Sequence, residues 1–302
     1  MKTKFYTYIR VLRVNQWLKN LIIFSAILFS GQLFNINLFV KSFWAFLIFC
    51  LLSSTSYVLN DIIDYRFDQK HPVKKNRPIA SGLISIPEAT FVVFILSMTS
   101  LILALFFSLP FFLLAFLFIL LHFFYSLYLK RHPVVDIFAI SFSFMLRTFA
   151  GEVATGFHIP IWLLLTIFFV SLFMATVKRH AELVAQGRET RASLKLYQEH
   201  LLNFMSTTFA AGTILAYASY TYNIVDVPQM GSVFNETVAP FEGRKWMMVT
   251  IPFVVYGIAR YAQLLYEREQ GERPEKIITT DRPLVATIIV WAMIVVALIY
   301  LF

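Results

Sequence analysis

The chain has 302 residues, of which 59% are hydrophobic and only 14% are charged, and its formal net charge is +9. Soluble domains average about 25% charged residues, so this composition excludes an ordinary soluble protein and indicates an integral membrane protein. The single cysteine, Cys50, excludes an intrachain disulfide and a cysteine-based metal site.

Apolar segments long enough to cross a bilayer follow one another along the chain, each needing roughly 20 mostly apolar residues. In chain order the nine segments run over 20–38, 40–58, 90–108, 111–129, 134–153, 160–177, 201–221, 246–265 and 283–302. The sequence therefore predicts one all-α integral membrane domain over residues 1–302, with about nine transmembrane helices.

Lys and Arg residues are distributed unevenly around these segments. They precede the first segment and follow the second, fourth, sixth and eighth, whereas the opposite side holds only Lys41, Arg244 and Lys245. The positive-inside rule then places the N-terminus and the loops after even-numbered segments on the cytoplasmic side, and the C-terminus outside. This distribution indicates the lipid bilayer, and not a nucleic acid, as the partner of the excess positive charge.

Acidic residues gather in the loop that follows the second segment. Asp61, Asp64 and Asp68 are spaced by three and four, and Asn60 lies four residues before Asp64. On a helix these positions would share one face. Carboxylates at the end of a membrane span are unfavourable unless cations neutralise them, so the cluster requires a positively charged partner.

Two interpretations of the cluster differ in that partner. In the simpler one the carboxylates are solvated and paired with Arg66, Lys70 and Lys74. In the other they hold Mg²⁺, which prefers oxygen ligands and often combines one or two carboxylates with substrate phosphates. The basic residues that follow, Lys74, Lys75 and Arg77, would then bind those phosphates. We favour the second hypothesis.

Several blocks of sequence resemble one family. The stretch NDIIDYRFD at 60–68 is similar to the N-D-x-x-D-x-x-x-D signature of the UbiA superfamily of intramembrane prenyltransferases. Further blocks resemble the decaprenyl-phosphate phosphoribosyltransferase branch: NQWLKN (15–20), HPVKKNRPIASG (71–82), YSLYLK (125–130), LRTFAGEVATG (146–156), KRHAEL (178–183) and DRPL (281–284). The resemblance covers nearly the whole chain.

This resemblance implies a fold, an activity and a site. The fold is a UbiA-like bundle with a polar cavity facing the cytoplasm, in the inner membrane of a bacterium. The activity is transfer of 5-phosphoribose from phosphoribosyl pyrophosphate to a polyprenyl phosphate, with release of pyrophosphate. The resemblance also implies Mg²⁺ as cofactor, held with the donor diphosphate by Asn60, Asp61, Asp64 and Asp68. A homo-oligomer is one option for the assembly.

The region after the sixth segment differs from that of prenyl-transferring relatives, which carry a second acidic motif there. This chain has Lys178, Arg179 and Glu182 instead. Lys178 and Glu182 are four residues apart, so a helix pair would also explain them. Because cations replace acids, we expect Lys178 and Arg179 to bind the 5-phosphate of the donor, with Glu182 beside them.

Other candidate substrate contacts are charged or aromatic and lie near the predicted cytoplasmic ends of the segments. They are Lys19, Lys74, Arg77, Tyr125, Tyr128, Lys130 and Asp136. The basic residues in this set would also be explained by the excess of positive charge on the cytoplasmic side, and Lys19 by extension of its side chain to the membrane surface. Arg147 differs because it lies inside the fifth segment, where a buried arginine needs a partner on another helix or a water-filled cavity. Both alternatives stay open for Arg147.

The implied reaction needs positioning and electrostatic stabilisation more than acid–base chemistry. A polyprenyl phosphate is already an anion at pH 7, and cations can neutralise the leaving pyrophosphate. One alternative is a UbiA-type prenyltransferase that moves an isoprenyl chain from its diphosphate to an aromatic acceptor; the missing second acidic motif argues against it. Another is a transporter or lipid-binding protein without chemistry.

Overall fold

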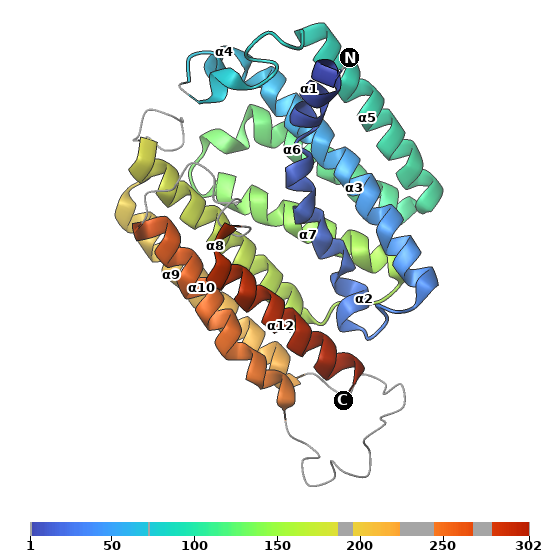
Figure 1. Cartoon of the computed structure of the whole chain (residues 1–302), viewed down its shortest axis with the longest axis vertical. Helices are drawn as coiled ribbons and strands as arrows, with labels where there is room; N and C mark the ends of the chain where they lie inside the picture. Colours follow the sequence, from blue (N-terminus) through green and yellow to red (C-terminus); the bar gives the residue numbers. More distant parts are fainter. Residues whose placement is uncertain (1, 72, 187–195, 224–244, 268–279, 302) are drawn as a thin grey trace. The chain divides into compact units, whose positions relative to one another are not determined.

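The computed structural model describes residues 2–71, 73–186, 196–223, 245–267 and 280–301, and every regular element in these ranges is a helix (Figure 1). The contacts divide the chain into two compact units. Unit 1 comprises Met1–Ile27 and Leu33–His158, and unit 2 comprises Leu28–Gln32 and Ile159–Phe302. The acidic cluster predicted from the sequence belongs entirely to unit 1.

Helix α3 is the central element of unit 1. The elements in chain order are α1 (Lys2–Leu12), η1 (Val14–Phe24), α2 (Ser25–Phe29, which leads into unit 2), α3 (Ile36–Ile63), α4 (Tyr65–Asp68), η2 (Lys74–Asn76), α5 (Ile86–Phe107), α6 (Leu109–Leu127), η3 (Leu129–Arg131) and α7 (Val135–Thr155). Helix α3 packs against α1, η1, α5, α6 and α7. Phe49 of α3 meets Phe111 and Phe118 of α6 edge-on, in the middle of a buried apolar cluster. Val58, near the end of α3 that carries the acidic residues, belongs to a second buried cluster with Ile79 and Ile84.

Unit 2 is also built of helices. It contains α8 (Ile161–Gln186), α9 (Glu199–Asn223), η6 (Trp246–Thr250), α10 (Ile251–Glu267) and α12 (Arg282–Tyr300). Helix α8 packs along α9, and α10 contacts α8, α9 and α12. Asp281 caps α12 by accepting a hydrogen bond from the N–H of Leu284 at 3.0 Å, and it also binds Arg260 through two hydrogen bonds. The block DRPL therefore starts the last helix.

Eight of the described helices are long and apolar enough to cross a membrane, and the apolar segment Val14–Phe29 is shorter. The prediction of an all-α chain with about nine membrane segments is confirmed, but the predicted first span, 20–38, is wrong. The chain leaves this segment after Phe29, and Asn35 caps α3 by accepting from the N–H groups of Asn37 and Leu38. Apolar residues continue on both sides of that turn, so hydropathy alone could not place it.

The first apolar segment, Val14–Phe29, has few residues for a membrane span, but most of them form a 3₁₀-helix, which is longer per residue than an α-helix. The eleven residues of η1 form a 3₁₀-helix and the five of α2 an α-helix. A 3₁₀-helix rises about 2.0 Å per residue and an α-helix about 1.5 Å, so together they extend about 30 Å. That length matches the hydrocarbon thickness of a bilayer, roughly 30 Å.

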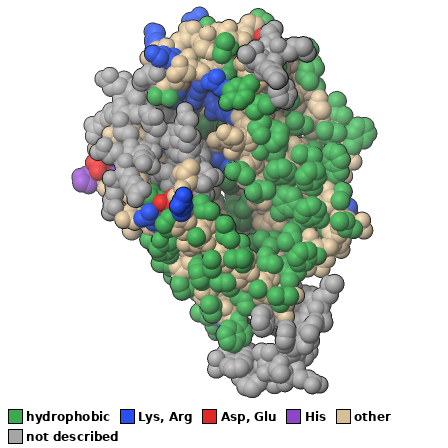
Figure 2. All heavy atoms as spheres, in the orientation of Figure 1, with side chains coloured by type: hydrophobic (Ala, Val, Ile, Leu, Met, Phe, Trp, Pro, Cys, Tyr) green, Lys and Arg blue, Asp and Glu red, His purple; other side chains and the backbone are tan. Residues whose placement is uncertain are grey.

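The surface fits a lipid environment. Hydrophobic side chains cover most of the described surface on the face that Figure 2 shows. Helix α5 leaves Phe91 65% exposed and Phe106 85% exposed, which would be unfavourable in water. Part of the predicted cytoplasmic charge (Arg188, Arg191, Lys195, Arg268, Arg273 and Lys276), and Arg244 on the opposite side, lie outside the described residues.

Candidate active site

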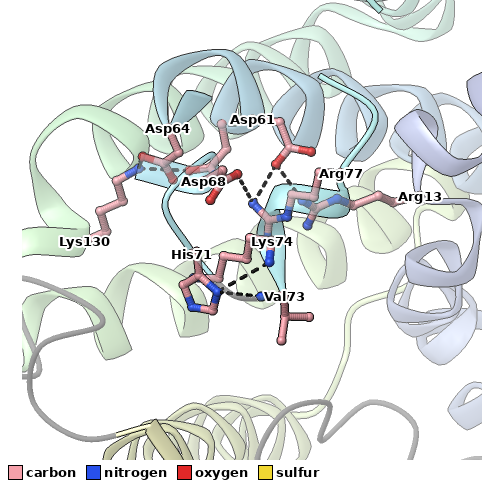
Figure 3. Close-up of polar contacts among 10 residues, drawn as sticks. Arg13, Asp61, Asp64, Asp68, His71, Val73, Lys74, Arg77 and Lys130 are labelled. Carbon is pink, nitrogen blue, oxygen red and sulfur yellow. Dashed lines mark hydrogen bonds and ion pairs between the residues drawn. The ribbon is translucent and has the colours of Figure 1, made fainter. Parts of the chain in front are cut away.

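The acidic cluster lies where α3 gives way to α4. Helix α3 ends at Ile63, Asp64 follows it, and the N–H of Asp68 bonds to the carbonyl of Asp64 at 2.9 Å. The backbone therefore keeps a nearly helical path through the cluster, which brings the side chains of Asp61 and Asp68 to a shared partner (Figure 3). Asp64 turns to a different cation, so the acids are divided between two sites of positive charge.

Arg77 is the cation that Asp61 and Asp68 share. Its Nη1 lies 3.0 Å from Asp61 Oδ1 and 2.6 Å from Asp68 Oδ2, and both aspartates are 4% exposed. Burial raises the pKa of Asp68, although the nearby Arg77 guanidinium opposes that shift. The carboxyl of Asp68 thus accepts a proton at a higher pH than an exposed aspartate does. In the described part of the chain Arg66 forms no ion pair with these aspartates, whose cationic partners are Arg13, Arg77 and Lys130.

Arg13, one of the basic residues that precede the first apolar segment, is a second cationic partner of Asp61. Its Nη2 lies 2.5 Å from the same Asp61 Oδ1 that Arg77 contacts, and its guanidinium lies over the ring of Tyr57, 5.2 Å from the centroid. Arg13 precedes η1 and has φ +50°, a left-handed conformation that is uncommon for a residue other than glycine. Nothing in the sequence pattern singles out this arginine from its neighbours.

Lys130 neutralises the other half of the cluster. Its Nζ lies 2.5 Å from Asp64 Oδ1 and 3.1 Å from Asn60 Oδ1, and its side chain is 12% exposed. It reaches the cluster from η3, the turn that follows α6. This geometry places Lys130 within the acidic cluster, while its contact with a phosphate stays a prediction.

A strained turn separates Lys130 from α7. The N–H of Val135 bonds to the carbonyl of Pro133 at 2.8 Å, which makes a γ-turn around Val134 with φ +68°. Such turns are rare, and a branched side chain makes this one more unfavourable. Asp136 follows in the first turn of α7, where it is fully buried. The turn thus fixes both predicted site residues, Lys130 and Asp136, relative to each other.

The cluster offers oxygen ligands that suit a magnesium ion. Among the described residues no group of three or more His, Cys, Asp or Glu side chains is close enough to form a metal site by itself. Mg²⁺ does not require such a group, because it often binds one or two carboxylates and completes its shell with water and substrate phosphates. Arg77 Nη1 already occupies a cation position between Asp61 and Asp68, and Lys130 Nζ occupies one between Asn60 and Asp64. The residue set therefore fits the metal.

Arg147 lies in a separate, enclosed polar network. It is 3% exposed, and its guanidinium donates to Asn20 Oδ1 at 2.7 Å, to the Ser143 carbonyl at 2.7 Å and to Ser53 Oγ at 3.4 Å. It also lies over the ring of Phe118, 4.6 Å from the centroid. The sequence left open whether Arg147 has a partner on another helix or lines a water-filled cavity. In the structure Arg147 has partners on two other helices, Asn20 of η1 and Ser53 of α3. These partners are neutral, so amide, hydroxyl and carbonyl oxygens, together with aromatic rings, surround a buried positive charge.

The remaining predicted residues lie at several places. Lys19 of η1, Lys74 of η2 and Tyr125 of α6 are half-buried, and Tyr128 at the end of α6 is 59% exposed. In unit 2, Arg179 of α8 is 1% exposed and binds Glu182 at 2.7 Å. Lys178 is half-buried beside Arg179. The substrate-binding roles of all these residues stay predictions.

Comparison with known proteins identifies the family. Residues 21–280 match the model of the UbiA prenyltransferase family. The chain is a member of this family. It is 31% identical to the decaprenyl-phosphate phosphoribosyltransferase of Corynebacterium glutamicum, over 97% of this chain and 86% of that protein. It is 32% identical to that of Mycolicibacterium smegmatis, over 97% and 92%.

The fold agrees with that assignment. The structure matches that of a UbiA homologue from Archaeoglobus fulgidus bound to DMAPP and Mg²⁺, with a TM-score of 0.69 over 97% of this chain and 99% of that one. The sequences are 19% identical, so this likeness concerns the fold. This UbiA family member is thus a membrane-embedded transferase, as the sequence blocks indicated, and not a transporter or a lipid-binding protein without chemistry.

Proposed function

We propose that this UbiA family member transfers 5-phosphoribose from phosphoribosyl pyrophosphate to a polyprenyl phosphate. The main support is its similarity to two relatives named decaprenyl-phosphate phosphoribosyltransferase, at 31% and 32% identity over 97% of the chain. The prenyl-transferring alternative has weaker support, because α8 carries Lys178 and Arg179 where such enzymes have a second acidic motif.

The acidic cluster is the proposed site of the donor's diphosphate. Asp61 and Asp68, and Asn60 with Asp64, would hold Mg²⁺ through oxygen atoms that now accept hydrogen bonds from cations. When bound, the metal supplies positive charge to the leaving pyrophosphate. Arg77 lies close enough to the carboxylates to bind phosphate oxygens beside the metal. Burial of the aspartates strengthens these electrostatic interactions relative to those in water.

The bond changes are a substitution at C1 of the ribose. The bond between C1 and the pyrophosphate oxygen breaks, and the pyrophosphate leaves with the electron pair. A phosphate oxygen of the lipid forms the new bond to C1, and in-line attack inverts that carbon. No base is needed, because the polyprenyl phosphate is already an anion. The cations Arg77 and Lys130 would stabilise the charge that develops on the leaving group.

The proposed orientation matches the solubility of the two substrates. The cluster ends α3 in a loop that the positive-inside rule places on the cytoplasmic side, where the water-soluble donor is present. The polyprenyl phosphate would approach from the bilayer, along the apolar surface of the helices. We therefore place the protein in the inner membrane of a bacterium, with the active site facing the cytoplasm.

Radiolabelled phosphoribosyl pyrophosphate tests this function directly. Purified protein in detergent is incubated with the labelled donor, a polyprenyl phosphate and Mg²⁺, and the organic phase is analysed for labelled lipid. Labelled lipid that disappears when EDTA removes the metal is the expected result. Transfer of an isoprenyl group from its diphosphate to an aromatic acceptor, with no use of phosphoribosyl pyrophosphate, would overturn the proposal.

A further inference from the structure

We propose that Arg13 is a substrate-binding residue that releases Asp61 and binds the diphosphate of the donor when the metal arrives. This inference rests on the proposed function, because it assigns a further contact to the same site. It concerns a residue that lies 48 positions before Asp61 in the chain and outside the acidic motif and the basic loop. Arg13 directly precedes η1, so this exchange of partners would link the position of the start of η1 to the binding of the donor.

The geometry around Asp61 is the first support. One carboxylate oxygen, Asp61 Oδ1, accepts from Arg13 Nη2 at 2.5 Å and from Arg77 Nη1 at 3.0 Å. Asp61 is 4% exposed, whereas the side chains of Arg13 and Arg77 are each 26% exposed. The oxygen that a metal would use thus carries two guanidinium groups, both of which remain within reach of a ligand from solution. A bound metal would displace both.

The backbone of Arg13 is the second support. Arg13 and Val134 are the two non-glycine residues with positive φ in the described part of the chain. Arg13 contacts Asp61, and Val134 lies between Lys130 and Asp136, so both border the acidic cluster. Strained residues of this kind collect at ligand clamps, because surrounding contacts must hold them in place. The contact between Arg13 and Asp61 holds this conformation without a ligand, and a bound diphosphate would hold it afterwards.

The charge balance is the third support. Asp61, Asp64 and Asp68 carry three negative charges, and Arg13, Arg77 and Lys130 carry three positive ones. An anionic donor would gain little from a neutral cluster. If Mg²⁺ takes the carboxylates, the three cations are released from the acids and can bind phosphate oxygens, for which the guanidinium of Arg13 is well shaped. The cations that neutralise the aspartates in the absence of ligand would therefore bind the donor once the metal has replaced them at the carboxylates.

A purely neutralising role for Arg13 predicts the opposite response to its removal. Without Arg13, Asp61 would lose a competing cation and bind the metal more tightly. Binding of magnesium pyrophosphate would then be unchanged or stronger. If Arg13 instead contacts the diphosphate, its removal weakens binding by about tenfold or more, the usual effect of losing a charge-assisted hydrogen bond.

The experiment measures binding of magnesium pyrophosphate to the purified protein by calorimetry, without turnover. The variants are Arg13→Ala, Arg13→Lys and Arg13→Gly, with Arg10→Ala as the matched control. Arg10 is also basic and donates to the Asn76 carbonyl at 3.0 Å, but it contacts no carboxylate in the described structure. Arg13→Gly relaxes the left-handed backbone while removing the guanidinium, so it separates strain from contact. Thermal unfolding shows whether each variant is folded.

Weaker binding in Arg13→Ala and Arg13→Gly, an intermediate loss in Arg13→Lys and no change in Arg10→Ala are the expected results. If Arg13→Ala does not fold, Arg13→Lys, which keeps the charge, provides the comparison. Binding equal to that of wild type in the folded variants would overturn the role of Arg13 and leave the proposed function intact. No binding by the wild type would overturn the metal–diphosphate site itself. If the protein binds magnesium pyrophosphate but does not use phosphoribosyl pyrophosphate in the labelling assay, only the proposed identity of the donor is rejected.

Discussion

Asp61 accepts hydrogen bonds from two guanidinium groups through one oxygen, and its side chain is almost fully buried. It therefore serves two purposes: it neutralises Arg13 and Arg77 in the structure, and it is a proposed metal ligand. Removing one partner of a buried ion pair destabilises a protein by about 3 kcal/mol or more in fully buried cases, and by less here because the arginines are partly exposed. A loss of activity at Asp61 would thus combine two effects.

Asp64 offers the cleaner test of the metal site. Its side chain is 24% exposed and its cation, Lys130, is also held by Asn60. We expect Asp64→Asn to abolish turnover while lowering the unfolding temperature less than Asp61→Asn does, because less buried charge is left unpaired. Activity is measured by transfer of labelled phosphoribose and stability by thermal unfolding in detergent. Wild-type turnover in Asp64→Asn would remove Asp64 from the metal site.

Arg77 should not be replaceable by lysine. One guanidinium nitrogen contacts both Asp61 and Asp68, and the rest of the planar group is needed for phosphate oxygens. We expect Arg77→Lys to raise the KM for the donor by about tenfold, consistent with loss of one charge-assisted contact. Arg66→Ala is the control, since the Arg66 side chain is exposed and is not assigned to a phosphate. Equal KM values for wild type and Arg77→Lys would limit the role of Arg77 to neutralising Asp61 and Asp68.

At the scale of elements, the close approach of η1 to α7 determines where the first segment lies. Gly151 of α7 has no side chain, and a Cβ there would come within 2.2 Å of the carbonyl oxygen of Ile23 in η1. Arg147, one turn earlier on α7, binds Asn20 of η1 at 2.7 Å. Because Arg13 directly precedes η1, these contacts also position the arginine at the acidic cluster.

Two glycine-to-alanine substitutions should have opposite effects. Gly151→Ala forces the backbones of η1 and α7 apart, so we expect it to destabilise the protein by about 1–3 kcal/mol, as overpacking does. Gly257→Ala, in the interior of α10, meets nothing within 4 Å and should stabilise by about 0.5–1 kcal/mol through helix propensity. Thermal unfolding of both variants in the same detergent measures the difference. Equal shifts would contradict the close approach.

The Arg147 network predicts an unusual rank order at Asn20. Asn20→Ala removes the oxygen that accepts from both Arg147 and Ser53, leaving buried donors unpaired. Asn20→Asp keeps that oxygen and adds a negative charge beside the buried guanidinium. We therefore expect Asn20→Asp to retain more stability than Asn20→Ala, which should lose about 1–3 kcal/mol. Leu18→Ala on the exposed side of η1 is the control. Unfolding temperatures in the reverse order would show that Arg147 does not depend on Asn20.

At the scale of the whole molecule, the segments fix which loops share a side of the membrane. The turn at 30–35 and the loop at 64–85 are separated by α3, so they must face opposite sides if α3 spans the bilayer. In the topology that we propose from the positive-inside rule, the second of them, with the acidic cluster, faces the cytoplasm. The N-terminal helix α1 then lies on the same side as the cluster, which agrees with the contact between Arg13 and Asp61.

Cysteine labelling tests this orientation, and the native cysteine does not have to be replaced first. The native Cys50 is fully buried in α3, so it should not react. Phe34 is 74% exposed. We expect Phe34→Cys to react with a membrane-impermeant maleimide in spheroplasts whose cytoplasmic membrane is intact. Lys75→Cys should react only after the membrane is permeabilised. The reverse pattern would invert the proposed topology.

The sequence by itself determined the class of fold, the approximate helices and the acidic motif, because these depend on local composition and on spacing along one helix. Eight of the nine predicted segments lie close to described helices, and the first was displaced because an apolar run does not reveal where a turn interrupts it. The sequence also singled out Lys130 as a candidate phosphate contact, but it did not predict that Lys130 pairs with Asp64 and Asn60.

The tertiary structure alone decided which charges meet. Arg13 lies 48 residues from Asp61, and Asn20 lies 127 residues from Arg147, so no local pattern connects either pair. The close packing of η1 on α7 also decides that a Cβ at Gly151 would clash with the carbonyl oxygen of Ile23. The contacts of Arg13 with Asp61 and of Arg147 with Asn20 satisfy buried polar groups across helices, and that need is defined only once the helices have packed.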